Sequence, residues 1–396
     1  FRNDMAWFQG DAVRKNPNLK PETTISKEIG AEVRLLDGRL TADVTYYDKY
    51  TRDQIVESEL SYLSNYQRVI INSGKISNKG WEISVSGVPV KVKNFEWKTI
   101  FNWSKNNSMV ESLPEGIDKI QIGSGVYNVK SYAEVGKPYG AIYAKTFKRD
   151  AEGYILCQLD GSPKEGQDYE YLGCVQADWR GGWNNVFRLG NFSFSVMFDF
   201  QKGGKFFSQT SIQSSVDGQS VKSLEGRDAD FFSRKILGES DEERYGFMRP
   251  QNANTPTANG QVYPDWGRPK GVVLPNCRYD EDVEGLAGQQ VLGYCTPERY
   301  WMHYTSRDIS RFIYDASYVK LREITVSYDL PKKWLRKTPF QTFRVAAVGR
   351  NIATLFANTP HGLDPQATST TGNAQGFERG FNLPSATYGF DIKVSF

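Results

Sequence analysis

The sequence is dominated by short stretches in which apolar and polar residues alternate strictly. Between Phe192 and Phe200 every even position is apolar and most odd positions are polar. The last nine residues, Tyr388 to Phe396, repeat this pattern. Successive side chains of a β-strand point to opposite faces of the sheet, so the alternation predicts strands with one apolar and one polar face. A chain built from such strands must cover its apolar face with a second layer or with lipid.

The same alternation recurs along the chain and defines most of the expected strands. These stretches lie at 28–35, 40–46, 81–86, 95–104, 183–189, 323–329 and, more weakly, 343–347. Strict up-and-down order also asks for a strand between 105 and 180. The best candidate is 154–159, which follows 139–147 across the turn Asp150-Ala151-Glu152-Gly153. The sequence therefore predicts about ten or eleven antiparallel strands.

The connections between these strands alternate in length. Short turns are expected at 36–39, 93–94, 190–191 and 331–339, and long polar connections at 51–75, 105–137, 160–180, 201–316 and 356–384. Loops this long are uncommon in compact soluble domains. Transmembrane β-barrels have short turns on one side and long loops on the other, with strands of about 9–11 residues. We therefore predict an all-β, antiparallel transmembrane β-barrel in which 201–316 is a long extracellular loop region.

The composition excludes several other classes. Aromatic residues make up 14 % of the chain, whereas disordered proteins are poor in them. No window approaches the ~18 uncharged apolar residues of a membrane-spanning helix. The formal net charge of +3 gives no electrostatic case for nucleic acid. No nucleophile–base pair and no zinc motif accompany the two histidines and four cysteines, so we expect no enzyme, metal or cofactor.

Open edges are the next constraint. A sheet that ends in lipid would leave backbone groups unpaired, which the bilayer core does not tolerate. Further strands are therefore expected upstream of Phe1, which cannot be a translation start. The stretch 1–18 has no signal-peptide pattern. We expect the chain to be part of a longer protein, with a signal peptide and any internal plug lying outside it.

Several motifs, taken in order, resemble TonB-dependent outer-membrane receptors. They are NPNLKPE at 16–22, NKGWEI at 78–83, and DWRGGW at 178–183 followed by NFSF at 191–194. Three more resemble the SusC/RagA subfamily: YVKLRE at 318–323, GRN at 349–351 and GLDP at 362–365. The final Phe396 matches the terminal aromatic that such barrels present to their assembly machinery. The corresponding strand residues are Tyr388, Phe390, Ile392, Val394 and Phe396.

The resemblance implies a function and a set of partners. It implies that residues 1–396 supply the C-terminal portion of a 22-stranded barrel in the outer membrane of a Gram-negative, Bacteroidetes-like cell. Such a barrel would import oligosaccharides or oligopeptides with a SusD-like surface lipoprotein as lid. It would be driven by TonB through the missing plug region. The implied partners are the upstream remainder of the barrel, the SusD-like lipoprotein, TonB, the glycan or peptide substrate and outer-membrane lipid, with no nucleic acid.

Two alternative functions stay open. A secreted all-β carbohydrate-binding or adhesion protein would bury its apolar faces between two sheets. It would have no reason to alternate short and long connections. A siderophore or cobalamin receptor of the same class would keep the barrel but change the cargo.

An aromatic cluster gives the first candidate substrate site. Tyr300, Trp301, His303 and Tyr304 stand together in the 201–316 region, and Trp266 precedes them. Aromatic faces offer large rigid contact area for a sugar or a peptide. The alternative is that these rings pack within the loop or contact the lid protein. On the strands, the polar alternation predicts a set of residues facing the barrel lumen: Asp43, Glu82, Lys98, Asp199, Glu323, Asp391 and Lys393.

The four cysteines allow two loop disulfides. Cys157 and Cys174 have nearly the same separation as Cys277 and Cys295, and an oxidising compartment would favour pairing. The alternative is four unrelated thiols. The resembling family often carries an Asp- and Gly-rich run where 157–173 lies, and here only Asp160-Gly161 remains. The resemblance therefore predicts no calcium there, and a Cys157–Cys174 link could replace it.

Overall fold

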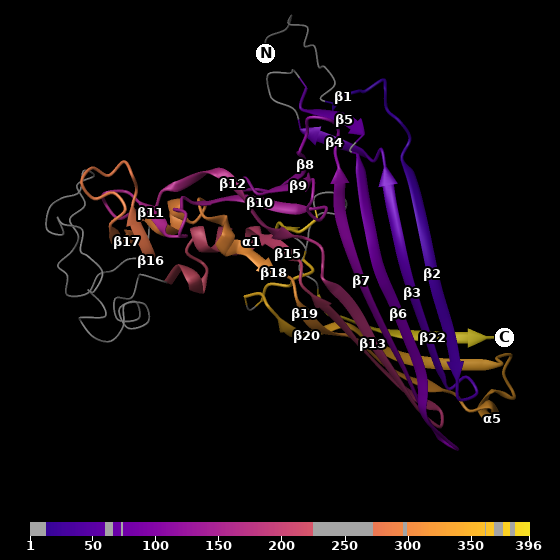
Figure 1. The fold of residues 1–396 in the computed structure, drawn as a ribbon. Helices are drawn as coiled ribbons and strands as arrows, with labels where there is room; N and C mark the ends of the chain where they lie inside the picture. Colours follow the sequence, from indigo (N-terminus) through magenta and orange to yellow (C-terminus); the bar gives the residue numbers. More distant parts are fainter. Residues whose placement is uncertain are drawn as a thin grey trace, which may run out of the picture.

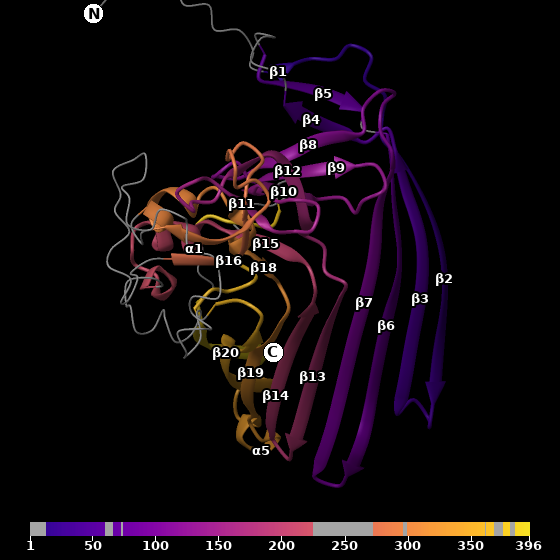
Figure 2. The ribbon, with the colours of Figure 1, turned by 60° about the vertical axis from the view of Figure 1, so that its left-hand side comes forward.

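The chain forms one large antiparallel sheet with a smaller assembly of loops at one end. The computed structural model describes residues 13–59, 66–72, 74–224, 272–295, 299–360, 362–367, 375–380 and 385–396. Its long strands stand side by side and curve into a wall, while most of the other elements gather beyond one end of the strands (Figures 1 and 2). We call the large sheet the wall.

The wall contains nine strands, and all of its neighbouring strands are antiparallel. In spatial order they are β2 (Thr23–Leu35), β3 (Leu40–Arg52), β6 (Lys75–Val92), β7 (Phe95–Ser112), β13 (Trp179–Leu189), β14 (Phe192–Lys202), β19 (Tyr318–Asp329), β20 (Thr342–Ala357) and β22 (Thr387–Ser395). Sequence order and spatial order coincide, as predicted for an up-and-down barrel. The sheet is not closed, with β2 and β22 at its edges.

The prediction of ten or eleven wall strands was wrong in two places. Residues 139–147 and 154–159 do form β10 (Ala141–Phe147) and β11 (Ile155–Cys157), but neither strand belongs to the wall. β7 pairs directly with β13, so the up-and-down order is complete without an extra strand. Both strands are buried inside the loop assembly, and their apolar residues therefore look like those of a wall strand in the sequence.

The wall has two chemically different faces, and the strand register shows both. One row of side chains across β6, β7, β13 and β14 runs Val85, Phe101, Trp183 and Phe198. The neighbouring row runs Ser84, Asn102, Gly182 and Asp199, and continues to Lys320 on β19. The first row lies on the apolar face and the second on the polar face, as the alternation predicts.

Polar atoms on the apolar face hydrogen-bond to one another. The Trp97 indole Nε1 donates to Asn185 Oδ1 at 3.0 Å, and the Trp183 Nε1 donates to Thr99 Oγ1 at 2.9 Å. Both bonds join β7 to β13 on the face that also carries Phe101. An unpaired polar group is costly in lipid, so this pairing suits a face that lies against hydrocarbon.

Glycine permits a close approach within the wall. A side chain at Gly80 on β6 would place its Cβ 2.3 Å from the Lys105 carbonyl oxygen and 2.4 Å from the Tyr47 hydroxyl. The Tyr47 hydroxyl donates to Asn106 Oδ1 at 3.0 Å, and Asn106 Nδ2 donates to Asn78 Oδ1 at 3.1 Å. The 78–83 motif therefore holds Tyr47 flat against the polar face.

The loop assembly consists of three small sheets and several short helices. A four-stranded sheet joins β8 (Lys119–Ser124), β9 (Lys130–Glu134), β10 and β12 (Glu165–Cys174). A second joins β11, β16 (Val272–Tyr279) and β17 (Gln290–Cys295), and a third joins β15 (Lys205–Ser208), β18 (Ile313–Asp315) and β21 (Phe377–Glu378). The helical elements are α1 (Gln209–Val216), η2 (Val221–Leu224), η3 (Tyr300–Tyr304) and η4 (Ile309–Phe312).

Two further elements complete the described fold. A three-stranded sheet joins β1 (Val13–Arg14), β4 (Ile55–Glu59) and β5 (Arg68–Asn72) above the ends of β2 and β3 (Figure 1). At the opposite end, α5 (Lys332–Leu335) lies in the turn between β19 and β20. No helix within the described residues is both long enough and apolar enough to cross a membrane. The helical pattern expected at 228–237 lies outside the described residues.

Candidate functional site: the polar face of the wall

The polar face is hollowed along its length. One cavity of about 400 Å³ lies over β3, β6, β7, β13 and β14, and its lining includes Asp43, Glu82, Asn102, Arg180 and Asp199. The predicted lumen-facing positions Asp43, Glu82 and Asp199 are thereby confirmed on this face.

Two more cavities continue the hollow toward the loop assembly. One has a volume of about 280 Å³ and shares Arg180 with the first. The other has a volume of about 380 Å³ and shares both Arg180 and Asp199 with it. Arg180 lines all three cavities, it is exposed, and its Nε donates to Gln201 Oε1 at 3.1 Å. We call this continuous polar surface the lumen groove.

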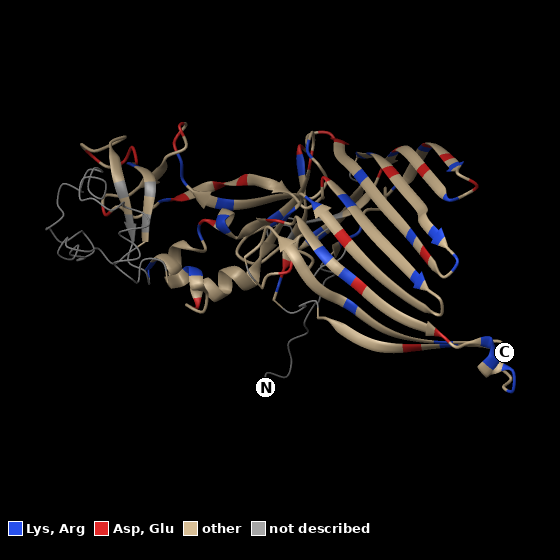
Figure 3. Ribbon diagram, turned by 90° about the horizontal axis from the view of Figure 1, so that it is seen from below, with Lys and Arg blue, Asp and Glu red and all other residues tan. Residues whose placement is uncertain are grey.

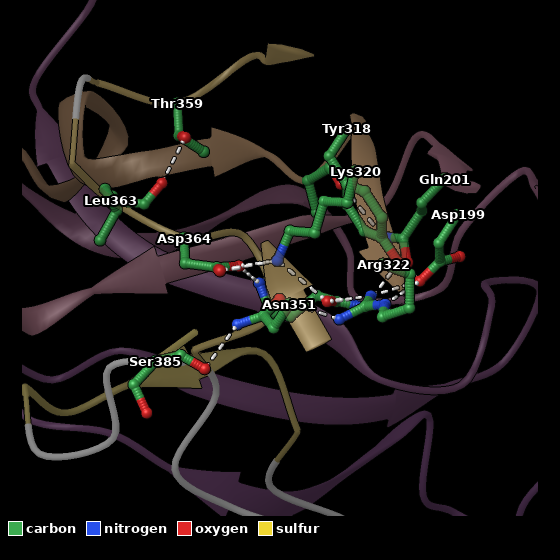
Figure 4. A network of polar contacts seen from close by, with 12 residues as sticks. Asp199, Gln201, Tyr318, Lys320, Arg322, Asn351, Thr359, Leu363, Asp364 and Ser385 are labelled. Carbon is green, nitrogen blue, oxygen red and sulfur yellow. Dashed lines mark hydrogen bonds and ion pairs between the residues drawn. The ribbon is translucent and has the colours of Figure 1, made fainter. Parts of the chain in front are cut away.

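A short segment of chain is bound to the upper part of the groove. Figure 4 shows Asp364 beside Lys320 and the neighbouring Arg322 beside Asp199. Lys320 Nζ lies 2.5 Å from Asp364 Oδ1 and 3.0 Å from Gln366 Oε1. We call the segment from Thr359 through Ala367, of which residue 361 is not described, the strap.

A second cation extends this network across the wall. Arg322 donates from Nε to Asp199 Oδ2 at 3.2 Å, from NH1 to Asn351 Oδ1 at 3.2 Å and from NH2 to Gln366 Oε1 at 2.7 Å. The Tyr318 hydroxyl donates to Asp199 Oδ2 at 3.3 Å. The three SusC/RagA-like motifs at 318–323, 349–351 and 362–365 therefore meet in one network.

Burial makes this network energetically important. Lys320 is only 1 % exposed, yet its ammonium has a carboxylate and an amide oxygen within hydrogen-bonding distance. A buried charge that keeps its partner is tolerated, whereas removing one partner leaves an uncompensated charge. The strap is thus fixed to the wall by a bond that is costly to break.

A second surface, on the four-stranded loop sheet, was missed in the sequence analysis. One face of that sheet carries alternating tyrosines and lysines: Lys119, Lys130, Tyr132, Lys137, Tyr143, Lys145, Tyr169 and Tyr171. Lys119 Nζ lies 5.2 Å from the centre of the Tyr143 ring, and Lys137 Nζ lies 4.4 Å from that of Tyr171. We call this the Tyr/Lys face. The alternation at 130–132 and 169–171 could have indicated this face. It was not recognised because tyrosines and lysines together do not form a clear pattern of apolar and polar residues.

The opposite face of the same sheet belongs to the hydrophobic cores of the loop assembly. Ile142 and Ala144 of β10 pack with Phe207, Ile212 and Phe312, and Ile120 and Ala133 belong to a separate core. One face of the sheet is therefore fixed by packing. The Tyr/Lys face is left with aromatic rings, of which Tyr171 is exposed, and with lysines, of which Lys137 and Lys145 pair with Glu134 and Glu165.

The predicted aromatic substrate residues do not form an open platform. Tyr300, Trp301 and Tyr304 lie in η3 and are buried in a core with Phe147 and other side chains of β11, β16 and β17. His303 is exposed, on the opposite side of the same turn. Trp266 lies outside the described residues. Substrate contact by this group stays a prediction, and in the structure its three buried rings hold the loop assembly together.

The structure does not bring Cys157 and Cys174 together, and a link between Cys277 and Cys295 stays a prediction. The register places Cys174 opposite Ala141 at one end of the β10–β12 strand pair. The backbone of Cys157 pairs with that of Pro163 beyond the other end. A strand of this length separates them by about 30 Å, far beyond disulfide reach. Cys174 is a free thiol, and burial raises its pKa. In β16 and β17, Cys277 lies opposite Val291 and Cys295 opposite Val272.

Lysines neutralise the carboxylates of the outer loop core. Asp280 is almost completely buried, and Lys148 Nζ and Lys164 Nζ lie 2.9 Å and 2.7 Å from its oxygens. Burial alone would raise the pKa of Asp280, but the hydrogen bonds from Lys164 and Lys148 outweigh it and lower the pKa to about 2. Within the described residues, no three His, Cys, Asp or Glu side chains are placed to hold a metal ion.

The last strand carries the predicted assembly residues on one face. Tyr388, Phe390 and Ile392 are exposed on the apolar side of β22, where Phe390 lies opposite Ala347. Phe396 follows the strand, and its ring lies 5.2 Å from that of Phe340. Val394 lies opposite Phe343. Their role in barrel assembly stays a prediction.

Comparison with known proteins gives consistent results. Residues 2–119 match the family model described as TonB dependent receptor-like, beta-barrel. TonB-dependent receptor P3 of Formosa agariphila is 25 % identical over 395 residues, which cover 94 % of this chain and 33 % of that protein. TonB-dependent receptor SusC of Bacteroides thetaiotaomicron is 29 % identical over 104 residues, which cover 26 % of this chain and 10 % of that protein.

Solved structures agree on the fold. The structure of the RagAB peptide transporter superposes with a TM-score of 0.60 at 16 % identity, covering 96 % of this chain and 36 % of that one. The RagAB peptide importer in its closed-closed state gives a TM-score of 0.58. The chain thus spans about a third of the length of the first relatives it matches.

Proposed function

Because the chain belongs to the TonB-dependent receptor β-barrels of the outer membrane, of the SusC/RagA type, we propose that the whole protein imports a nutrient. The proposed cargo is an oligosaccharide or an oligopeptide. The proposed partners are a SusD-like surface lipoprotein, as lid, and TonB, as the energy source. The residues of this chain shape the path of the cargo and carry out no catalysis.

The lumen groove is the structural feature that supports this proposal most directly. Its three cavities share Arg180, and two of them share Asp199, so one polar path runs along the wall. A carboxylate, a guanidinium and several amide and hydroxyl groups line it, which suits a hydrated, hydrogen-bonding cargo. The apolar face on the other side of the same strands suits lipid.

The Tyr/Lys face supports a first contact at the extracellular end. Tyrosine rings provide flat contact area, and the lysines beside them provide charge, so the surface suits a sugar or a peptide chain. Among the similar structures, that of RagAB is the structure of a peptide transporter. The peptide cargo is that of RagAB, and the surface of this chain suits both an oligosaccharide and an oligopeptide.

Uptake by cells that produce the full-length protein tests the proposal. Cells lacking the protein are expected to lose uptake of either a labelled oligosaccharide pool or a labelled oligopeptide pool. Purification of the tagged full-length protein from detergent-solubilised membranes is expected to yield a surface lipoprotein with it. Unchanged uptake of both pools in the deletion strain would contradict the import function.

A matched pair of variants tests the groove itself. Arg180→Ala removes the cation that lines all three cavities and is expected to reduce uptake several-fold. Lys105→Ala is the control, because Lys105 lies opposite Trp81 on the other face of the wall. Both variants should reach the outer membrane in equal amounts. Equal uptake by the two variants would show that the groove does not contact the cargo.

A further inference from the structure

The turn between β19 and β20 carries an unusual concentration of positive charge. Within six residues it has Lys332, Lys333, Arg336 and Lys337, and these surround Trp334, which is 61 % exposed. The turn is the blue cluster beside the C-terminal label in Figure 3. Leu335 is buried and anchors α5. We call residues 332–337 the basic turn.

No described residue neutralises the cations of the basic turn. Within the described residues, none of the four forms an ion pair. Other cations at the same end do: Arg344 Nε lies 2.6 Å from Asp329 Oδ1, and Lys91 Nζ lies 3.1 Å from Glu96 Oε2. Some cations at this end are therefore balanced by carboxylates, whereas the four of the basic turn, which follow one another within six residues, have no such partner among the described residues.

The basic turn borders the face of the wall that lies against lipid. The Phe340 ring, just after the turn, lies 5.9 Å from that of Phe343 and 5.2 Å from that of Phe396. Phe343 pairs with Val394 on the apolar face, and Phe396 is exposed. An aromatic cluster thus leads from the hydrocarbon-facing surface directly to the four cations. In a membrane-spanning barrel the border of the hydrocarbon-facing surface lies at the level of the headgroups, where tryptophan is enriched.

We propose that the basic turn binds the headgroups of anionic phospholipids in the leaflet at the short-turn end of the barrel. Short turns face the periplasm in outer-membrane barrels, so this is the periplasmic leaflet. Lys and Arg clusters beside a membrane surface attract anionic lipid, and an exposed tryptophan inserts at the interface. A zwitterionic headgroup carries no net charge, so four cations without a carboxylate partner would attract it less strongly than an anionic one.

Native mass spectrometry of the delipidated full-length protein in detergent tests this binding. The protein is titrated separately with phosphatidylglycerol and with phosphatidylethanolamine of the same acyl chains. The unaltered protein is expected to bind phosphatidylglycerol more tightly. The variant K332Q/K333Q/R336Q/K337Q is expected to lose at least about tenfold of this preference, because headgroup attraction grows with each nearby cation.

Two further variants keep the test decisive. K332R/K333R/R336K/K337K keeps every charge and is expected to keep the preference, so a loss caused by misfolding is distinguished from a loss of charge. Trp334→Ala is expected to weaken both lipids equally. If the four-Gln variant fails to assemble, the half variants K332Q/K333Q and R336Q/K337Q should each lose part of the preference.

Three results would overturn the proposal. The first is equal binding of both lipids to the unaltered protein. The second is an undiminished preference in the four-Gln or half variants. The third is binding of soluble anionic cell-wall fragments to the basic turn with no preference between the lipids, which would assign the turn to the cell wall.

Discussion

The wall and the loop assembly use the same apolar residue types in opposite directions. On the wall, Phe390 and Ile29 are 86 % and 73 % exposed, whereas in the loop assembly Phe147 and Trp301 are 1 % exposed. The loop assembly therefore has the interior of a water-soluble protein, and the wall has its apolar surface outside. The same chain thus exposes apolar side chains on the wall and buries them in the loop assembly. The change from exposed to buried occurs where each long strand leaves the wall.

This difference implies two sources of stability. The loop assembly is stabilised by removing apolar surface from water. The wall buries little apolar surface within the chain and depends on its continuous backbone pairing and on lipid. The network around Lys320 fixes the strap to the wall by buried polar contacts, so the effects of substitutions should differ sharply among wall, loop assembly and network.

The network around Lys320 should show the largest effect. Lys320→Ala leaves Asp364 without its ammonium partner, and breaking a buried pair costs about 3–5 kcal/mol. Hydrogen exchange of the full-length protein should show the strap losing protection by a comparable free energy. Lys145→Ala is the matched control, because its pair with Glu165 is partly exposed and 3.4 Å long, and should cost about 1 kcal/mol or less. Equal costs would mean that burial does not distinguish the two pairs.

A pair of phenylalanines tests the two solvents directly. Phe147→Ala opens a cavity in a closed core and should lower the free energy of unfolding of the loop assembly by about 3–5 kcal/mol. Phe101→Ala on the apolar face of β7 should cost much less, because lipid can fill the space. Local hydrogen exchange in the full-length protein measures both. A larger loss for Phe101→Ala would place that ring in a protein core rather than in lipid.

Neighbouring positions on β7 test the two faces of the wall. Phe101→Lys puts a charge into lipid and should cost about 2–4 kcal/mol, whereas Asn102→Lys puts the same charge into the lumen groove and should be tolerated. Denaturant unfolding in lipid vesicles measures the difference. Similar costs at both positions would show that the faces are not chemically distinct.

Acid should loosen the loop assembly before the wall. The folded pKa of Asp280 is about 2 against a reference of 3.8, so its stabilising contribution is complete above about pH 4 and is lost as the pH falls toward 2. The shift corresponds to about 2 kcal/mol. Hydrogen exchange of β16 and β17 should accelerate across this window, and Asp280→Asn should remove the pH dependence. A pH-independent rate in the unaltered protein would mean that the lysine pairing is not formed.

The wall could be predicted because its physical rule is local. The alternation from Phe192 to Phe200 identifies β14 nearly residue by residue. The weaker pattern at 343–347 marked only part of β20, which runs from Thr342 to Ala357, because the ladder with β19 is irregular near Leu321 and the alternation breaks there. The motif resemblance supplied the family, which periodicity alone could not.

The site could be predicted only in part. Alternation placed Asp199 on the polar face, but its bond to Arg322 joins residues 123 positions apart, and no local pattern encodes that distance. The aromatic group around Trp301 resembles a binding surface in the sequence. Its burial could not be predicted, because residues buried inside a loop assembly follow no regular apolar period. The assignment of β10 and β11 to the wall was wrong for the same reason, because the sequence does not show that a strand is buried in the loop assembly.

The two faces of the wall should lie in different solvents, one in lipid and the other in water. A nitroxide side chain placed in turn at Ser193, Phe194, Ser195 and Val196 of β14 tests it in the full-length protein in vesicles. Accessibility to oxygen dissolved in the lipid is expected to be high at positions 194 and 196. Accessibility to a water-soluble quencher should be high at 193 and 195. Equal accessibility at all four positions, or a water-exposed 194, would contradict the membrane wall.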